Sequence, residues 1–257
     1  MRSEPEQTDA PDAIPLGIHK LSFSLARRLL AGEHLVLWGP TGSGKTTLLR
    51  AIESRVLGRP CGRTVQTQSL DDITCALERA YPNVATRGVS RRTARERLWW
   101  AADRKPVVLL LDDVGHVGTV MKSFLRRLRG GIAGVMLAVD VDSPRERGRL
   151  RAQHLGCQTL RMPPLEGKAQ RALLETRWAA RELPTLPVTV RRQLIRLAHG
   201  RPGWIIACVD LARDRAYWRA DAVRSAILAL DTELRLRTSK RALAGIARGS
   251  GPSASEH

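Results

Sequence analysis

Eight consecutive residues have the types and spacing of a phosphate-binding loop, G-x-x-x-x-G-K-[ST]. In order they are Gly39, Pro40, Thr41, Gly42, Ser43, Gly44, Lys45 and Thr46. Glycines let such a loop curl until its N–H groups point at one spot, where a phosphate binds at the positive end of the following helix. We expect Lys45 to reach the β- and γ-phosphate oxygens of ATP and Thr46 to give its hydroxyl to Mg²⁺. Thr47, the next residue, completes the expected nucleotide-binding set.

The motif requires a strand before the loop and a helix after it. Residues 34–38 read as a short buried strand, and residues 47–57 carry apolar side chains at helical spacing. A glycine-rich turn that binds nothing does not need this setting. The sequence therefore predicts a strand, a nucleotide-binding loop and a helix in that order.

A fully apolar strand that ends in two acids is the second chemical signal. Residues 107–111 are apolar on both faces, as in a strand at the middle of a parallel sheet covered by helices. We expect Asp112 to hold Mg²⁺ and Asp113 to polarise the attacking water. After another buried strand at residues 134–139, Asp140 is the candidate to face the γ-phosphate. Asp142 is an alternative, and either acid could instead cap the next helix.

The chain is strongly basic, with 43 Lys and Arg against 25 Asp and Glu and a net charge of +18. This excess predicts a surface that meets polyanions, DNA first. A preference for Arg codons explains the rarity of Lys but not the excess of positive charge. Several arginines cluster before and within one predicted helix, where they line either a phosphate-tracking surface or a plain solvated face: Arg87, Arg91, Arg92, Arg95 and Arg97.

The fold class follows from the order of these signals. We expect an α/β fold, a P-loop NTPase parallel sheet flanked by helices, followed by a small all-helical lid domain. The expected parts are a disordered tail at 1–16, the ATPase core at 17–163, the lid at 164–236, and a helix end with a disordered tail at 237–257. No apolar run is long enough for a membrane span, and the polar first residues do not read as a signal peptide. A cytoplasmic protein with no membrane partner is therefore expected.

These parts in this order resemble the AAA+ superfamily of ATPases over roughly residues 17–230. The segment Pro163, Pro164, Leu165 and the turn at 199–206 are most similar to the small transposition-helper, secretion-ATPase and origin-recognition branches. The resemblance implies hydrolysis of ATP to ADP and phosphate by a ring or filament of identical subunits. It also implies a lid arginine that contacts the nucleotide. The position expected for this arginine, near 203–204, holds Gly and Trp, so Arg201 is the candidate.

An arginine finger from the neighbouring subunit is the last implied part. Arg151 is the first candidate and Arg149 the second, with Arg145 and Arg147 in the same stretch; each could also be solvated. Two functions stay open. One is an ATPase that assembles on DNA and recruits or regulates a partner such as a transposase. The alternative is a nucleotide-dependent switch with slow hydrolysis and no DNA role.

Three rival classes fit less well. No L-S-G-G-Q segment of a transporter ATPase lies between the loop and Asp112, and residues 64–75 lack the pore aromatic of a threading unfoldase. The long helical end is unlike the substrate domain of a small-molecule kinase.

Overall fold

Five parallel strands form the central sheet, in the order β2-β3-β4-β1-β5. They are β1 His34–Gly39, β2 Cys61–Arg63, β3 Val107–Leu111, β4 Ile132–Asp140 and β5 Gln158–Arg161. This computed structural model describes residues 16–115, 123–126, 131–141, 156–220 and 222–249. The parallel sheet confirms the predicted fold class, and all five carboxyl ends meet at one edge.

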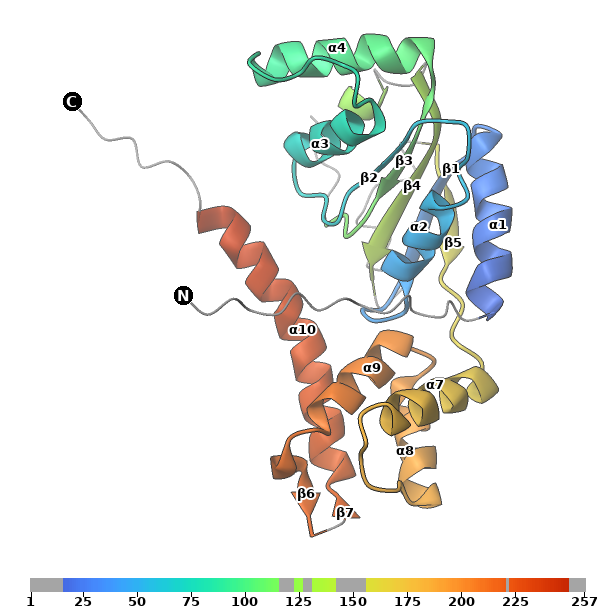
Figure 1. Cartoon of the computed structure of the whole chain (residues 1–257), viewed down its shortest axis with the longest axis vertical. Coiled ribbons are helices and arrows are strands. Elements are labelled where there is room, and N and C mark those ends of the chain that lie inside the picture. The colour runs from blue at the N-terminus through green and yellow to red at the C-terminus, as the bar shows by residue number, and fades with distance from the viewer. Residues whose placement is uncertain (1–15, 116–122, 127–130, 142–155, 221, 250–257) are drawn as a thin grey trace, which may run out of the picture.

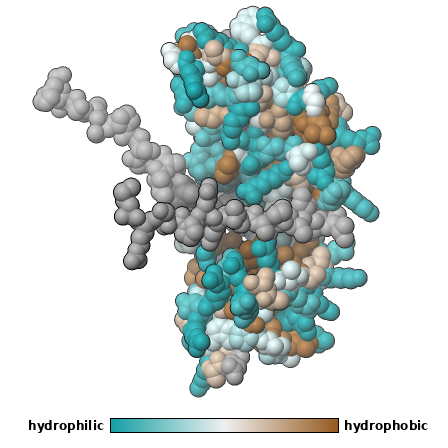
Figure 2. Space-filling model, in the orientation of Figure 1, coloured by the Kyte–Doolittle hydropathy of each residue, from teal (hydrophilic) through white to brown (hydrophobic). Residues whose placement is uncertain are grey.

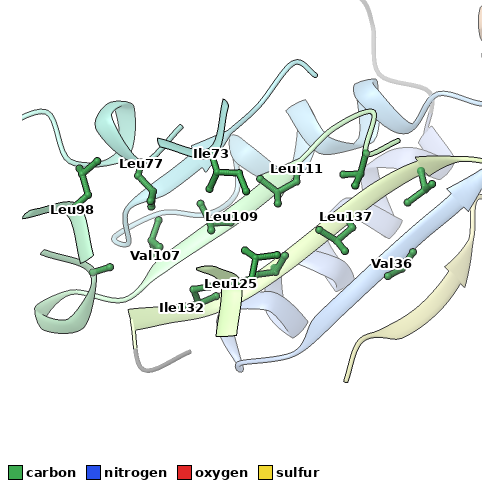
Figure 3. Close-up of a cluster of buried hydrophobic side chains, with 14 of the residues drawn as sticks. Val36, Ile73, Leu77, Leu98, Val107, Leu109, Leu111, Leu125, Ile132 and Leu137 are labelled. Atoms are coloured by element: carbon green, nitrogen blue, oxygen red, sulfur yellow. The ribbon is translucent and has the colours of Figure 1, made fainter. Parts of the chain in front are cut away.

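Helices cover both faces of the sheet (Figure 1). Helices α1 Leu16–Leu30 and α2 Lys45–Glu53 pack on one face, and α3 Leu70–Ala80 and α4 Arg91–Arg104 pack on the other. The unbroken apolar sequence of β3 serves both layers because side chains alternate along a strand. Val107, Leu109 and Leu111 face α3 and α4 (Figure 3), whereas Val108 and Leu110 face α1 and α2. This double burial explains why β3 carries no polar residue.

Close packing fixes α1 against the sheet. A Cβ atom added to Gly134 on β4 would lie 2.4 Å from the carbonyl oxygen of Leu29 on α1. No side chain fits there, so the helix backbone rests directly on the strand. This contact anchors β4, whose last residue reaches the predicted nucleotide loop.

Side-chain hydrogen bonds mark two element boundaries. β2 ends at Arg63, and the following Thr64 and Thr67 bond to Asp112 directly after β3. α3 begins after Ser69, which caps the helix in a reciprocal capping box with Asp72.

The chain after β5 forms the C-terminal helical region. It contains α7 Gly167–Ala179, α8 Val188–Ala198, α9 Pro202–Leu211 and α10 Ser225–Gly249, packed around their own apolar cluster. It also contains the short η3 helix Arg215–Tyr217 and a hairpin of β6 Trp218–Arg219 with β7 Ala222–Val223. The expected all-helical region did not include this hairpin. Figure 2 shows a mostly hydrophilic face interrupted by small hydrophobic patches.

Some expected segments lie outside the described residues. They include residues 1–15 of the tail expected at 1–16, residues 250–257 of the segment expected at 237–257, and the arginine-rich stretch at 142–155. Among the residues that are described, no helix is long and apolar enough to cross a membrane.

Candidate active site

The predicted phosphate-binding loop joins the carboxyl end of β1 to the first turn of α2. β1 ends at Gly39 and α2 begins at Lys45. Gly42 and Gly44 have φ angles of 79° and 94°, in the left-handed region that glycine enters without a steric penalty. Thr46 and Thr47 lie half-buried in the first turn of α2. The loop thus has the strand, the left-handed glycines and the helix that the motif requires.

Lys45 is a buried cation inside this loop, with only 6% of its side chain exposed. Its Nζ donates hydrogen bonds to the carbonyl oxygens of Gly39 and Pro40, both at 2.9 Å, and to Ser43 Oγ at 3.2 Å. The same ammonium forms an ion pair with the Asp140 carboxylate. Removing one partner of a buried pair costs about 3–5 kcal/mol, so these contacts hold the loop and the tip of β4 together.

Asp140 reaches the loop because β1 and β4 are neighbours, with Gly39 directly opposite Asp140 in the strand register. One Asp140 oxygen pairs with Lys45, and the other accepts a hydrogen bond from Thr41 Oγ1 at 3.3 Å. This arrangement favours a role in positioning Lys45 and Thr41. Direct contact of Asp140 with nucleotide stays a prediction, and Asp142 lies outside the described residues.

Asp112 follows β3 at the same edge of the sheet and is 3% exposed. One carboxylate oxygen, Oδ1, accepts the Asp113 backbone N–H at 2.9 Å. Burial raises the pKa of Asp112 above its usual value, while the Thr46 hydroxyl, the Asp113 N–H and the charge of Lys45 oppose this rise. The structure therefore brings Asp112 together with the two residues at the start of α2.

The other oxygen of Asp112, Oδ2, is buried and has no hydrogen-bond partner among the described residues. A buried carboxylate oxygen without a partner is costly, and a cation would satisfy it. The adjacent Thr46 hydroxyl and the Asp112 carboxylate are the hard oxygen donors that Mg²⁺ prefers. These two residues fit the expected magnesium ion.

Polar residues after β2 hold the acids in place, and the sequence analysis did not identify them. Thr64 Oγ1 accepts the Asp112 N–H at 2.9 Å, and Thr67 Oγ1 donates to the Asp112 carbonyl at 2.8 Å. Gln66 donates to Asp113 Oδ2 at 3.4 Å. Asp113 itself has a φ of 44°, a strained conformation for a residue with a side chain. Knowledge that β2 lies beside β3 would have revealed this group.

The C-terminal helical region touches the loop through two glycines. The Gly203 N–H, in the first turn of α9, donates to the Gly42 carbonyl oxygen at 2.8 Å. A Cβ atom on Gly203 would lie 2.8 Å from the Gly42 Cα, so a side chain cannot fit between them. The loop and α9 are therefore in main-chain contact.

Arg201 precedes α9, but its guanidinium is engaged elsewhere. It forms a two-fold pair with the Glu233 carboxylate on α10, at 2.8 and 3.3 Å, and donates to the Ala198 carbonyl. The predicted contact of Arg201 with nucleotide stays a prediction, and this pairing gives the residue a structural role. Arg151 and the alternative finger residues lie outside the described residues. Trp204 is buried in the helical core.

A family comparison agrees with this geometry. Residues 35–138 match the model of the ATPase family associated with various cellular activities (AAA). This segment of the chain is therefore similar to an AAA domain. The matched segment begins in β1 and ends in β4, so it contains the loop, Asp112 and Asp113. No curated protein matches the chain.

Solved structures with a similar arrangement share little sequence with the chain. A DNA replication initiation factor is 17% identical, with a TM-score of 0.49 over 78% of this chain and 62% of that one. Domain III of the replication initiation protein DnaA from Thermotoga maritima is 16% identical, with a TM-score of 0.48 over 87% and 92% of the two chains. A katanin structure is 17% identical, with a TM-score of 0.49 over 98% and 88%. The chain thus spans less than two thirds of the first of these.

Substituting Gly203 tests the main-chain contact. Gly→Ala in a helix normally stabilises by about 0.5–1 kcal/mol, but here the new methyl group meets the loop backbone. We expect Gly203→Ala to lower the free energy of unfolding in urea by about 1–3 kcal/mol, the usual cost of overpacking. Gly167→Ala, in the first turn of α7, is the control because nothing lies within 4 Å of its added Cβ. Equal stability of the two variants would contradict the contact.

Substituting Asp112 tests the buried carboxylate. A raised pKa means that the folded state holds the Asp112 proton more tightly than the unfolded state, so its ionisation destabilises the fold as the pH rises. Without metal, Asp112→Asn should therefore be more stable than wild type at neutral pH, and the difference should shrink toward acidic pH. Urea titrations between neutral and acidic pH measure this difference in the free energy of unfolding. Exposed Asp103→Asn is the control; a pH-independent difference for Asp112→Asn would refute the assignment.

Proposed function

We propose that the AAA domain binds ATP with Mg²⁺ and hydrolyses it to ADP and phosphate. The observation that carries this proposal is the buried, unpartnered Asp112 oxygen beside Thr46, at the start of the helix that also contributes Lys45. A loop that bound only a small anion would not need a buried carboxylate next to it. A site for a metal–nucleotide pair does.

Each residue then has a defined task. The loop N–H groups bind the phosphates, and Lys45 neutralises charge on the β- and γ-phosphate oxygens. Thr46 and Asp112 hold Mg²⁺, which supplies further charge neutralisation. Asp113 accepts a proton from the water whose oxygen attacks the γ-phosphorus, and ADP leaves. Asp140 positions Lys45 and Thr41 from the tip of β4.

The complete site is proposed to include an arginine from a second subunit. Arg151, with Arg149 as the alternative, would stabilise the charge that develops on the transferred phosphoryl group. The active form is then a homo-oligomer, a ring or a filament. The proposed parts of each subunit are the ATPase core at 17–163 and a lid at 164–236.

The proposed setting is DNA, where the protein recruits or regulates a partner, as transposition helpers do. The support is the net charge of +18 and the exposure of several arginines on and before α4. Contacts to phosphates by such residues release counterions and drive binding. The pairing of Arg201 with Glu233 favours the second candidate, a slow nucleotide switch, because it occupies the arginine expected at the nucleotide.

Two variants separate nucleotide binding from hydrolysis. Lys45→Ala removes the buried cation of the loop, and we expect no detectable ATP binding by calorimetry. Asp113→Asn keeps the loop intact, so ATP binding should persist while the rate of phosphate release falls by about 10²-fold or more. Unchanged ATP affinity of Lys45→Ala would contradict the assignment of the nucleotide site to this loop. Undiminished turnover of Asp113→Asn would place the base elsewhere.

Duplex DNA separates the two candidate functions. If the protein acts on DNA, the ATPase rate should rise when duplex is added, and duplex affinity should fall steeply with salt. Phosphate release and fluorescence anisotropy measure the two effects. Slow turnover that duplex does not change, together with no duplex binding, would favour the switch.

A further inference from the structure

Helix α4 presents an aromatic side chain between two basic ones. Arg97, Trp100 and Arg104 are spaced at i, i+3 and i+7, which places them along one stripe of a helix. Trp100 is 65% exposed, among the most exposed large apolar side chains of the described residues. We call this stripe of Arg97, Trp100 and Arg104 the α4 surface.

The indole of Trp100 is held in place by its neighbour. It stacks on the Trp99 ring, with the centroids 6.1 Å apart and the planes at 24°. Trp99 in turn packs against the core between α4 and the sheet. An exposed ring that already stacks on a neighbouring ring loses little conformational freedom when a flat ligand stacks on it. Trp100 is thus a preorganised platform.

The charge around this platform is positive. Residues 87–105 contain seven Lys and Arg against two acids, Glu96 and Asp103. Glu96 pairs with Arg92. Among the described residues, no carboxylate lies within ion-pair distance of Arg97 or Arg104, although Arg97 also donates to the Ala85 carbonyl at 2.6 Å. The stripe therefore carries two arginines without a carboxylate partner in the described part of the chain, with one exposed acid, Asp103, three residues after Trp100.

We propose that the α4 surface binds single-stranded nucleic acid, with a base stacked on Trp100 and phosphates bound by Arg97 and Arg104. Base faces are available for stacking in single strands but are covered inside a duplex. A surface that met only duplex phosphates would gain nothing from an exposed indole. The inference rests on the nucleic-acid part of the proposed function, and it adds the strand form and the contact residues.

The location of this surface allows a clean test. Figure 1 places α4 at the end of the molecule opposite the C-terminal helical region, which contacts the nucleotide loop. Substitutions on α4 should therefore leave ATP affinity unchanged. A matched control exists on α1, where Phe23 is 58% exposed and lines a shallow hollow with Lys20, Arg27 and Arg28.

The experiment measures anisotropy of a labelled oligothymidine of about 20 nucleotides, and of a duplex of equal length, with the full-length protein. Trp100→Ala should weaken single-strand binding about 5- to 100-fold, and Trp100→Phe should restore most of it. Arg104→Gln should reduce the slope of log affinity against log salt by about 0.7. The controls Phe23→Ala and Arg27→Gln should change neither quantity.

Each other outcome has a distinct meaning. Equal single-strand affinities for Trp100→Ala and Phe23→Ala would overturn the inference, as would an equal loss for single strand and duplex in Trp100→Ala. If the wild type binds duplex but not the oligonucleotide, this inference falls while the proposed DNA role stands. If the wild type binds neither the oligonucleotide nor the duplex, the single-strand inference and the proposed DNA role are both refuted. The proposed ATPase activity is not affected by that result.

Discussion

The site depends on one buried ammonium group. Lys45 can lie inside the protein only because two loop carbonyls, the Ser43 hydroxyl and the Asp140 carboxylate replace the water it loses. That shell exists only if β1 and β4 are adjacent and parallel, so that Gly39 lies opposite Asp140. The strand order of the sheet is thus a condition for burying this charge.

The other residues at the carboxyl ends of the strands also depend on the strand order. Gly39, Thr64, Asp112 and Asp140 each lie at or directly after the carboxyl end of a different strand. Parallel pairing places these four chain segments side by side, although they are far apart in the sequence. Polar groups gather at this edge, whereas the interiors of β1, β3 and β4 are apolar. The basic stripe on α4 lies elsewhere, so the proposed nucleotide site and the proposed nucleic-acid surface share no residues.

Local patterns predicted the parts of the site that lie within short segments. The loop glycines and the apolar β3 with its two acids are both read from neighbouring residues. Contacts between segments were not predictable in this way. Thr64, Gln66 and Thr67 were missed because their partners are about 47 residues away, and their role depends on β2 lying beside β3. The pairing of Arg201 with Glu233 depends on how α9 packs against α10, which helical periodicity does not encode.

The Arg201–Glu233 pair connects the long α10 mechanically to the turn before α9. Figure 1 shows α10 projecting to one side from the C-terminal helical region. Its 25 residues span about 37 Å at a rise of about 1.5 Å each. Glu233 is the ninth residue of α10 and is tied through Arg201 to the turn that meets Gly42. A tilt of about 10° at Glu233 would carry the far end, about 24 Å away, through about 4 Å, so a load on the end of α10 would act on that turn.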